Sequence, residues 1–219
     1  VFSTEDDILI HGSIRGGTDG YQQFIPEKIT ASFKLLYGEA IWAQGHFWVS
    51  FNPDYKSIND LKGKKLGLGL RTQSDWGFNA WWNLKYGYDI TSDNSELYYL
   101  GPANQVQELL DGKVDAITMG LGIGADYETF LVVGPLRELE ASGRNIQYIG
   151  MEDDIISRLN KKYDTPYLSI NVPAGTMPKQ EQDINVGADR GYKACHESFS
   201  EDVAYDLVMQ VAKHAPEMK

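Results

Sequence analysis

The chain alternates short apolar runs with longer stretches in which apolar residues recur at helical spacing. Residues 104–112 illustrate the helical type: Val106, Leu109 and Leu110 share one face, and Gly112 suits a helix C-cap. Strands are expected at residues 1–4, 41–51, 65–70, 97–100, 114–118, 146–149, 167–172 and 185–187. This alternation predicts an α/β fold with mostly parallel strands.

The end of the chain carries another helical pattern. Ser200 suits an N-cap, and apolar residues follow it at helical spacing, namely Val203, Leu207, Val208 and Val211. We therefore expect a packed terminal helix.

One polar loop stands between an expected strand and an expected helix, in residues 61–82, LKGKKLGLGLRTQSDWGFNAWW. The helix is expected to start with Ser74 or Asp75 as its N-cap and to end at Gly87. Its first N–H groups and the positive end of its dipole would point to the carboxyl edge of the strand, where open α/β sheets bind ligands. An anion is the natural ligand for such a place.

Nucleotide-binding motifs do not fit this loop. Gly67-x-Gly69 begins like a dinucleotide fingerprint, but Thr72 stands where a third glycine is expected, and no Gly-Lys-Ser/Thr follows to make a P-loop. What remains is Arg71, Thr72, Gln73 and Ser74, a set that suits a carboxylate, which can accept from an Arg fork and from hydroxyls together. An ordinary capped loop with Arg71 in solvent is the alternative.

Composition narrows the class of partner. A formal net charge of −11 and a pI near 4.8 disfavour nucleic acid and anionic membranes. No apolar run approaches the roughly 20 residues that span a bilayer, and residues 1–10 lack the features of a secretory signal. The single cysteine, Cys195, cannot form an intrachain disulfide and is expected to be a small buried residue.

Other groups with chemical potential have simpler explanations. The histidines, among them His46, show no metal-ligand spacing, so neither a metal nor a cofactor is expected. Cys195 and His196 are adjacent in an expected helix, which would point their side chains apart. The acidic residues of MEDDII, 151–156, suit a helix start. Among several tryptophans, Trp76 is the one that we expect to stack on a ligand.

Three phrases of the chain together resemble one known family. They are SINDLKGKKLGLG at 57–69, VQELLDGKVDAITMGLGIG at 106–124 and INVPAGTMPKQEQDINVG at 170–187. In order and spacing they are similar to phrases of the TAXI family of TRAP-transporter solute-binding proteins. The PAGT phrase after a DLKGK phrase is the most specific part of the resemblance.

The resemblance implies a type II periplasmic binding fold, α/β, with two lobes of mixed, mostly parallel sheets around a ligand cleft. Residues 1–52 and 166–219 would form the first lobe and residues 53–165 the second. The family's first segment has no counterpart here, so the N-terminal part of the first lobe is expected to be missing. The implied protein is a periplasmic receptor without catalysis, a monomer delivered by a signal peptide that is absent from this chain.

The resemblance also implies site residues. Ser3 and Thr4, with Glu5 beside them, would face the cleft at the end of the first strand, and Thr72 and Ser74 match hydroxyls of the family's loop. Arg71, Gln73 and Asp75 depart from the family's residues there, so the resemblance does not imply the family's usual ligand. The remaining matches are Met119 and Gly120, after the family's DA phrase, and Tyr167, near the second hinge crossing.

Together these features predict a receptor that captures a small organic carboxylate of the glutamate, dicarboxylate or aromatic-acid type and delivers it to TRAP membrane subunits. In it, Arg71 would pair with the carboxylate and Trp76 would wall the apolar end. Two alternatives remain open at this point: an enzyme on the same fold that acts on a small acid or pyrimidine precursor, and a ligand-sensing module of a signalling protein.

Overall fold

The computed structural model describes residues 2–6, 12–13, 15–18, 20–29, 32–165 and 167–217, with the backbone alone described at 2–6, 39–42 and 217. None of the helices within these ranges is long and apolar enough to cross a membrane. The described strands are β1 Phe2–Asp6, β2 Phe33–Ser50, β3 Lys65–Leu68, β4 Glu96–Tyr99, β5 Ala116–Ile123, β6 Phe130–Val132, β7 Gln147–Ile149, β8 Leu168–Val172 and β9 Ile184–His196. The main helices are the π-helix η3 Ser74–Asn79, α2 Ala80–Tyr88, α3 Pro102–Leu110, α4 Gly134–Ala141, α5 Asp153–Tyr163 and α6 Glu201–His214, with short 3-10 turns η1 Tyr21–Gln23, η2 Ile58–Leu61 and η4 Ala215–Glu217.

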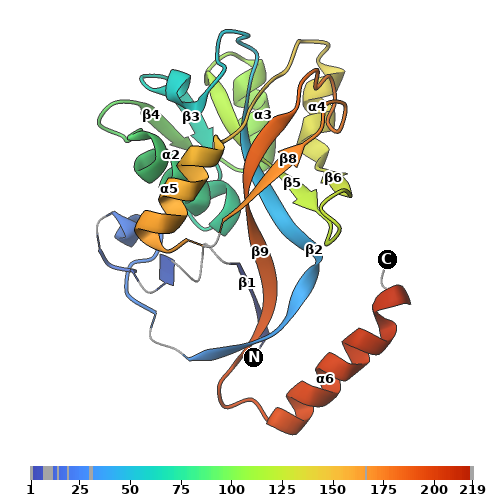
Figure 1. Cartoon of the computed structure of the whole chain (residues 1–219). Coiled ribbons are helices and arrows are strands. Elements are labelled where there is room, and N and C mark those ends of the chain that lie inside the picture. Colours follow the sequence, from blue (N-terminus) through green and yellow to red (C-terminus); the bar gives the residue numbers. More distant parts are fainter. Residues whose placement is uncertain are drawn as a thin grey trace.

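All the described strands belong to one curled sheet (Figure 1). Its main path runs β1-β9-β2-β5-β3-β4, and three short strands join it from the side: β6 on β5, β7 on β2 and β8 on β9. The two long strands β2 and β9 run side by side through the molecule, with most of the other elements around their upper part in Figure 1 and with β1 and α6 at the lower end.

The sheet is mixed, as predicted, but antiparallel pairs outnumber parallel ones, which corrects the expectation of mostly parallel strands. The parallel pairs are β3–β4 and β3–β5, which α2 and α3 connect as helical crossovers. The other described pairs are antiparallel: β2 pairs with β5, β7 and β9, β9 pairs also with β1 and β8, and β5 pairs with β6.

Each face of the sheet is covered by its own pair of helices. On the first face, Trp48, Leu66 and Leu68 pack with α2 and α5, through residues that include Trp82 and Leu159. On the second face, the apolar side chains of β2 and β5 pack with residues of α3 and α4. Successive residues of a strand alternate between the two faces. We call these the α2/α5 face and the α3/α4 face.

The end of β9 corrects one local expectation. The strand continues to His196, far beyond the predicted 185–187, because glycines and charged residues interrupt its apolar pattern without ending its pairing with β2. Cys195 and His196 therefore lie in a strand and not in a helix. Cys195 is buried, as predicted, and the exposed His196 bonds to Ser198.

The helix after β3 also differs at both ends from the prediction. It begins as the π-helix η3 with Gln73 as the N-cap residue, and α2 ends at Asp89 in a left-handed conformation. Gly87 lies inside α2, where a Cβ would sit 3.3 Å from the Ile155 side chain. Its role is close packing of α2 against α5 rather than helix termination.

The terminal helix forms where predicted but is not packed. α6 starts after Ser200, yet it contains no buried residue, and Val203, Tyr205 and Met209 are about half exposed or more. Figure 1 shows α6 set apart from the main body of the fold. Its amphipathic pattern predicted the helix correctly, but among the described residues few contacts cover its apolar face.

Candidate functional site

The carboxyl end of β3 is pressed tightly against η3. The Gly69 N–H donates to the Trp76 carbonyl at 2.6 Å, which ties the strand end to the helix. A Cβ at Gly77 would lie 2.0 Å from the Leu70 carbonyl oxygen, and one at Gly69 would lie 2.5 Å from Trp76. Only glycine fits at either place, so these glycines allow the loop to fold back on itself. η3 is a π-helix, a local geometry that is frequent at functional sites.

Arg71 does not point to an open anion site. Its Nη1 donates to Gln23 Oε1 at 2.6 Å, and its guanidinium lies 4.0 Å from the centre of the Tyr99 ring and 5.7 Å from that of Phe24. Burial raises the pKa of Tyr99, and the nearby Arg71 charge opposes this rise. This exposed, stacked guanidinium is closer to the capped-loop alternative than to a carboxylate fork.

The other residues of the loop have different positions. Gln73 is used by the loop itself, because its Oε1 accepts from the Leu70 N–H at 2.8 Å. Thr72 is exposed, and Ser74 is half-buried in the first turn of η3. The two hydroxyls therefore remain near the start of the helix, where the sequence placed them.

Glycines on β5 make room beside η3. Gly120 and Gly122 pair with His46 and Gln44 of β2, so the α2/α5 face of β5 lacks side chains at these positions. A Cβ at Gly120 would lie 2.8 Å from both Gln44 Nε2 and Trp76 Nε1. With the Gln44 amide oriented to satisfy its neighbours, its oxygen accepts from Trp76 Nε1 at 3.2 Å and its NH2 group donates to Asp75 Oδ2 at 2.9 Å.

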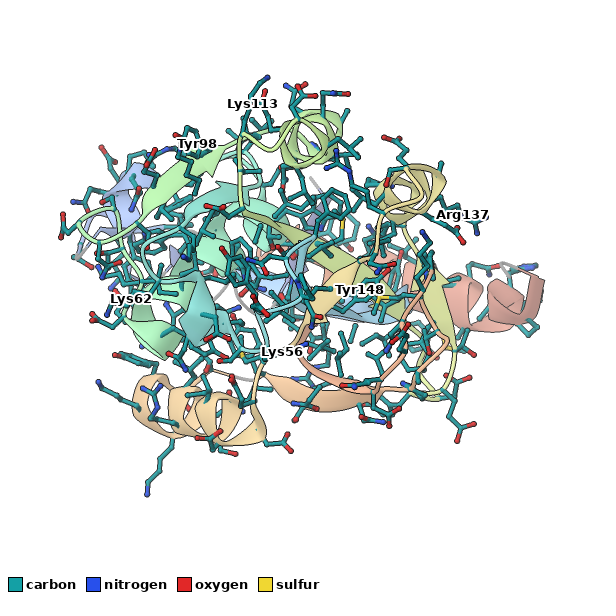
Figure 2. The ribbon with its side chains drawn as sticks, turned by 90° about the horizontal axis from the view of Figure 1, so that it is seen from above. Lys56, Lys62, Tyr98, Lys113, Arg137 and Tyr148 are labelled. Carbon is teal, nitrogen blue, oxygen red and sulfur yellow. The ribbon has the colours of Figure 1, made fainter. Side chains whose placement is uncertain are left out.

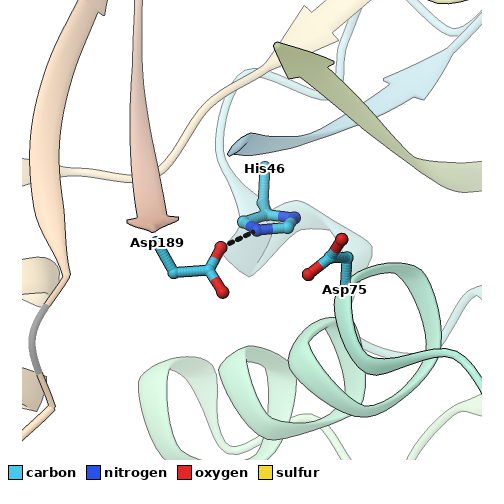
Figure 3. A group of neighbouring side chains, drawn as sticks. All are labelled: His46, Asp75 and Asp189. Carbon is cyan, nitrogen blue, oxygen red and sulfur yellow. Dashed lines mark hydrogen bonds and ion pairs between the residues drawn. The ribbon is translucent and has the colours of Figure 1, made fainter. Parts of the chain in front are cut away.

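Three titratable side chains meet at this position (Figure 3). His46 comes from β2, Asp189 from β9 and Asp75 from η3, and each offers a ligand atom within 4.8 Å of the other two. His46 Nε2 and Asp189 Oδ1 lie 2.6 Å apart. His46 and Asp189 are 5% and 2% exposed, so these two side chains are almost removed from water, while Asp75 is half-buried. Figure 3 shows the imidazole between the two carboxylates.

The remaining predicted residues lie outside this group. Met119 is fully buried on the α3/α4 face, because it alternates with Gly120 along β5. Tyr167 is buried on the α2/α5 face, where its hydroxyl donates to Asn79 Oδ1. The backbones of Ser3 and Thr4 pair with Ala194 and Lys193 of β9, and their side chains lie outside the described residues.

Sequence reasoning missed His46, Asp189 and Gln44. A signal existed, since His46 and Asp189 are polar residues inside strands that are otherwise mostly apolar or glycine-rich. The sequence did not reveal the pairing register of β2 and β9. This register sets Asp189 opposite Gln44 and diagonal to His46, although His46 and Asp189 are more than 140 residues apart in the chain.

A separate cavity lies at another place among the described residues. A groove of about 670 Å³ is lined by Phe51, Lys56, Tyr148, Glu152 and other residues of 145–152 and 179–185. Figure 2, seen from above, shows Lys56 and Tyr148 near each other in the middle of the view. The groove is open and lies past the Ser50 end of β2. We regard the position at the carboxyl end of β3 as the stronger site, because buried polar groups from three elements converge there.

Solved structures share this fold. XAC2383 from Xanthomonas citri, bound to ATP, is 8% identical with a TM-score of 0.55, and the match covers 98% of this chain and 64% of that one. The same protein bound to a chloride ion is 10% identical with a TM-score of 0.50, and the match covers 98% of this chain and 63% of that one. The substrate-binding protein of an amino acid ABC transporter is 14% identical over 84% of this chain and 58% of that one, with a TM-score of 0.43.

The chain thus spans less than two thirds of the length of each of these proteins. Its described residues have the mixed α/β fold of the type II periplasmic binding proteins. The chain belongs to the NMT1-like family, whose model matches residues 23–219. No curated protein gives a significant match.

Proposed function

We propose that this chain is the solute-binding part of a periplasmic receptor, which captures a small organic carboxylate and delivers it to TRAP membrane subunits. The observation that carries the proposal is the start of η3 at the carboxyl end of β3, where the Thr72 and Ser74 hydroxyls lie near the first N–H groups of the helix. In open α/β sheets, this edge is the usual ligand position. The family membership supports a binding role, and the three phrases at 57–69, 106–124 and 170–187 support the TAXI branch.

The proposed cleft lies between two lobes, residues 1–52 with 166–219 and residues 53–165. The long strands β2 and β9 would cross between them, and His46 and Asp189 lie on these strands. A ligand held here would contact both the helix start and the crossing strands. This arrangement would couple binding to lobe closure.

The Thr72 and Ser74 hydroxyls, with the first N–H groups of η3, would donate to the carboxylate. Trp76 would contribute an apolar wall, since its indole already lies over Gly120. Arg71 could reach the ligand only by leaving Gln23 and Tyr99, so we assign it a supporting role at the edge of the site.

A binding screen tests the proposal. Glutamate, short dicarboxylates and aromatic acids are titrated into the purified chain, first by thermal shift and then by calorimetry. At least one acid is expected to bind, and the double variant Thr72→Ala with Ser74→Ala should weaken its binding about a hundredfold or more, since each lost hydrogen bond to a charged group is worth about 1.5–3 kcal/mol.

Ser142→Ala is the matched control, because Ser142 is an exposed hydroxyl at the end of α4, away from β3. It should leave affinity unchanged. Equal affinity in the double variant and the control would overturn the assignment of the site, and turnover of a bound acid would overturn the receptor role.

A further inference from the structure

We propose that His46, Asp75 and Asp189 form a binding site for one divalent transition-metal ion, of which Zn²⁺ is the expected occupant. Their ligand atoms lie within 4.8 Å of one another, although the residues come from three separate elements. In a tetrahedral zinc site with bonds near 2.1 Å, neighbouring ligand atoms are about 3.4 Å apart. An ion would therefore replace the hydrogen bond between His46 Nε2 and Asp189 Oδ1, and these two atoms would move apart from 2.6 Å to about that distance.

The kind of donor selects the class of metal. One imidazole nitrogen with two carboxylate oxygens suits zinc, cobalt or manganese, whereas magnesium and calcium prefer oxygen ligands alone. Three protein ligands leave a further position for water. A divalent ion would also neutralise two carboxylates in a place where His46 and Asp189 are almost fully buried.

The ligands are supported by their surroundings, as in built metal sites. Gln44 donates to Asp75 Oδ2 and accepts from the Trp76 indole, which holds the Asp75 carboxylate toward His46. Such partners outside the ligand set commonly orient the ligands and change metal affinity about 10–100-fold when removed. The site would fasten β2 and β9 to η3, and this inference does not depend on the identity of the solute.

Cobalt binding gives a direct test. The purified chain is freed of metal with a chelator and titrated with Co²⁺, whose visible absorption reports the number and type of ligands, and Zn²⁺ is then added in competition. We expect one equivalent of Co²⁺, displaced by Zn²⁺, and a higher midpoint of thermal unfolding with Zn²⁺, because a ligand that binds only the folded state stabilises it.

Variants locate the ion. Asp75→Asn and Asp189→Asn should each weaken Co²⁺ binding at least about tenfold, while His196→Ala, which removes an exposed histidine, should not. Circular dichroism checks that each variant is folded. Asp75→Asn is the most informative variant, since Asp75 lies on η3 and outside the paired strands.

Three outcomes would overturn the proposal. The first is no stoichiometric binding, which would make the cluster a buried His–Asp pair alone. The second is unchanged binding in both aspartate variants. The third is loss of binding in His196→Ala, which would assign the ion to the surface.

Discussion

The two faces of the central strands serve different purposes. On the α3/α4 face, β5 presents Ile117, Met119, Leu121 and Ile123, all fully buried among apolar neighbours. On the α2/α5 face, the same strand presents Thr118 and then glycines, opposite Gln44 and His46 of β2. One face therefore stabilises the fold by apolar burial, and the other gives up part of that burial to hold polar groups.

This difference shows how a strand that is buried on both sides can still carry a site. Every residue of β5 is buried, so burial alone does not distinguish the two roles. What distinguishes them is the chemistry of alternate positions: branched apolar side chains fill one side, while glycines leave room on the other for side chains from η3 and β2.

The largest effect is expected on the apolar face. Phe47 of β2 is 1% exposed and packs beside Tyr148, with 5.9 Å between ring centres. Phe47→Ala should lower the free energy of unfolding by about 3–5 kcal/mol, measured by urea denaturation. The matched control is Phe33→Ala on the same strand, at 38% exposed, which should cost under about 1 kcal/mol. Equal losses would remove the distinction by burial.

A smaller loss of stability is expected on the polar face, with a larger effect on binding. In Gly120→Ala the added Cβ would displace Gln44 and Trp76, at a cost of about 1–2 kcal/mol. Co²⁺ binding and acid binding should both weaken. Gly101→Ala is the control, because a Cβ there meets nothing within 4 Å. Unchanged binding in Gly120→Ala would show that this face is not the site.

A still smaller effect is expected on the exposed helix. Tyr205 of α6 is 65% exposed, so Tyr205→Ala should change the free energy of unfolding by no more than about 0.5 kcal/mol. Denaturation under the conditions used for Phe47→Ala checks this. A loss above about 2 kcal/mol would mean that α6 packs against another surface in solution.

The smallest effect on stability is expected in the turn that follows β5, at the carboxyl group of Asp126. Asp126 accepts from the Thr129 hydroxyl and from the N–H groups of Thr129 and Glu128, which lowers its pKa to about 2. Since this folded-state pKa lies below the usual value near 3.9, the contribution to stability is complete above about pH 4 and is lost as pH falls through about 2. NMR titration of the carboxyl group measures the pKa.

A normal pKa for Asp126 would contradict these hydrogen bonds. Asp126→Asn should disturb the amide signals of the turn at neutral pH and leave those of the α3/α4 face unchanged.

The sequence predicted most of the strands and helices, because local periodicity and turn residues determine those elements, but it did not predict β6 or the continuation of β9 to His196. It also placed the polar loop correctly at the carboxyl end of β3. It did not predict that Arg71 stacks on Tyr99, since Tyr99 reaches this place only through the parallel pairing of β3 and β4. Nor did it reveal the meeting of His46 with Asp189, which depends on the register of β2 and β9.

Hydrogen exchange in the presence of a stabilising acid tests the proposed site most directly. If the acid binds at the carboxyl end of β3, amide exchange should slow in residues 69–79 of the loop and η3, and in residues 116–123 of β5. Slower exchange confined to residues 145–152 and 179–185, which line the large groove, would contradict the account and assign the solute to that cavity.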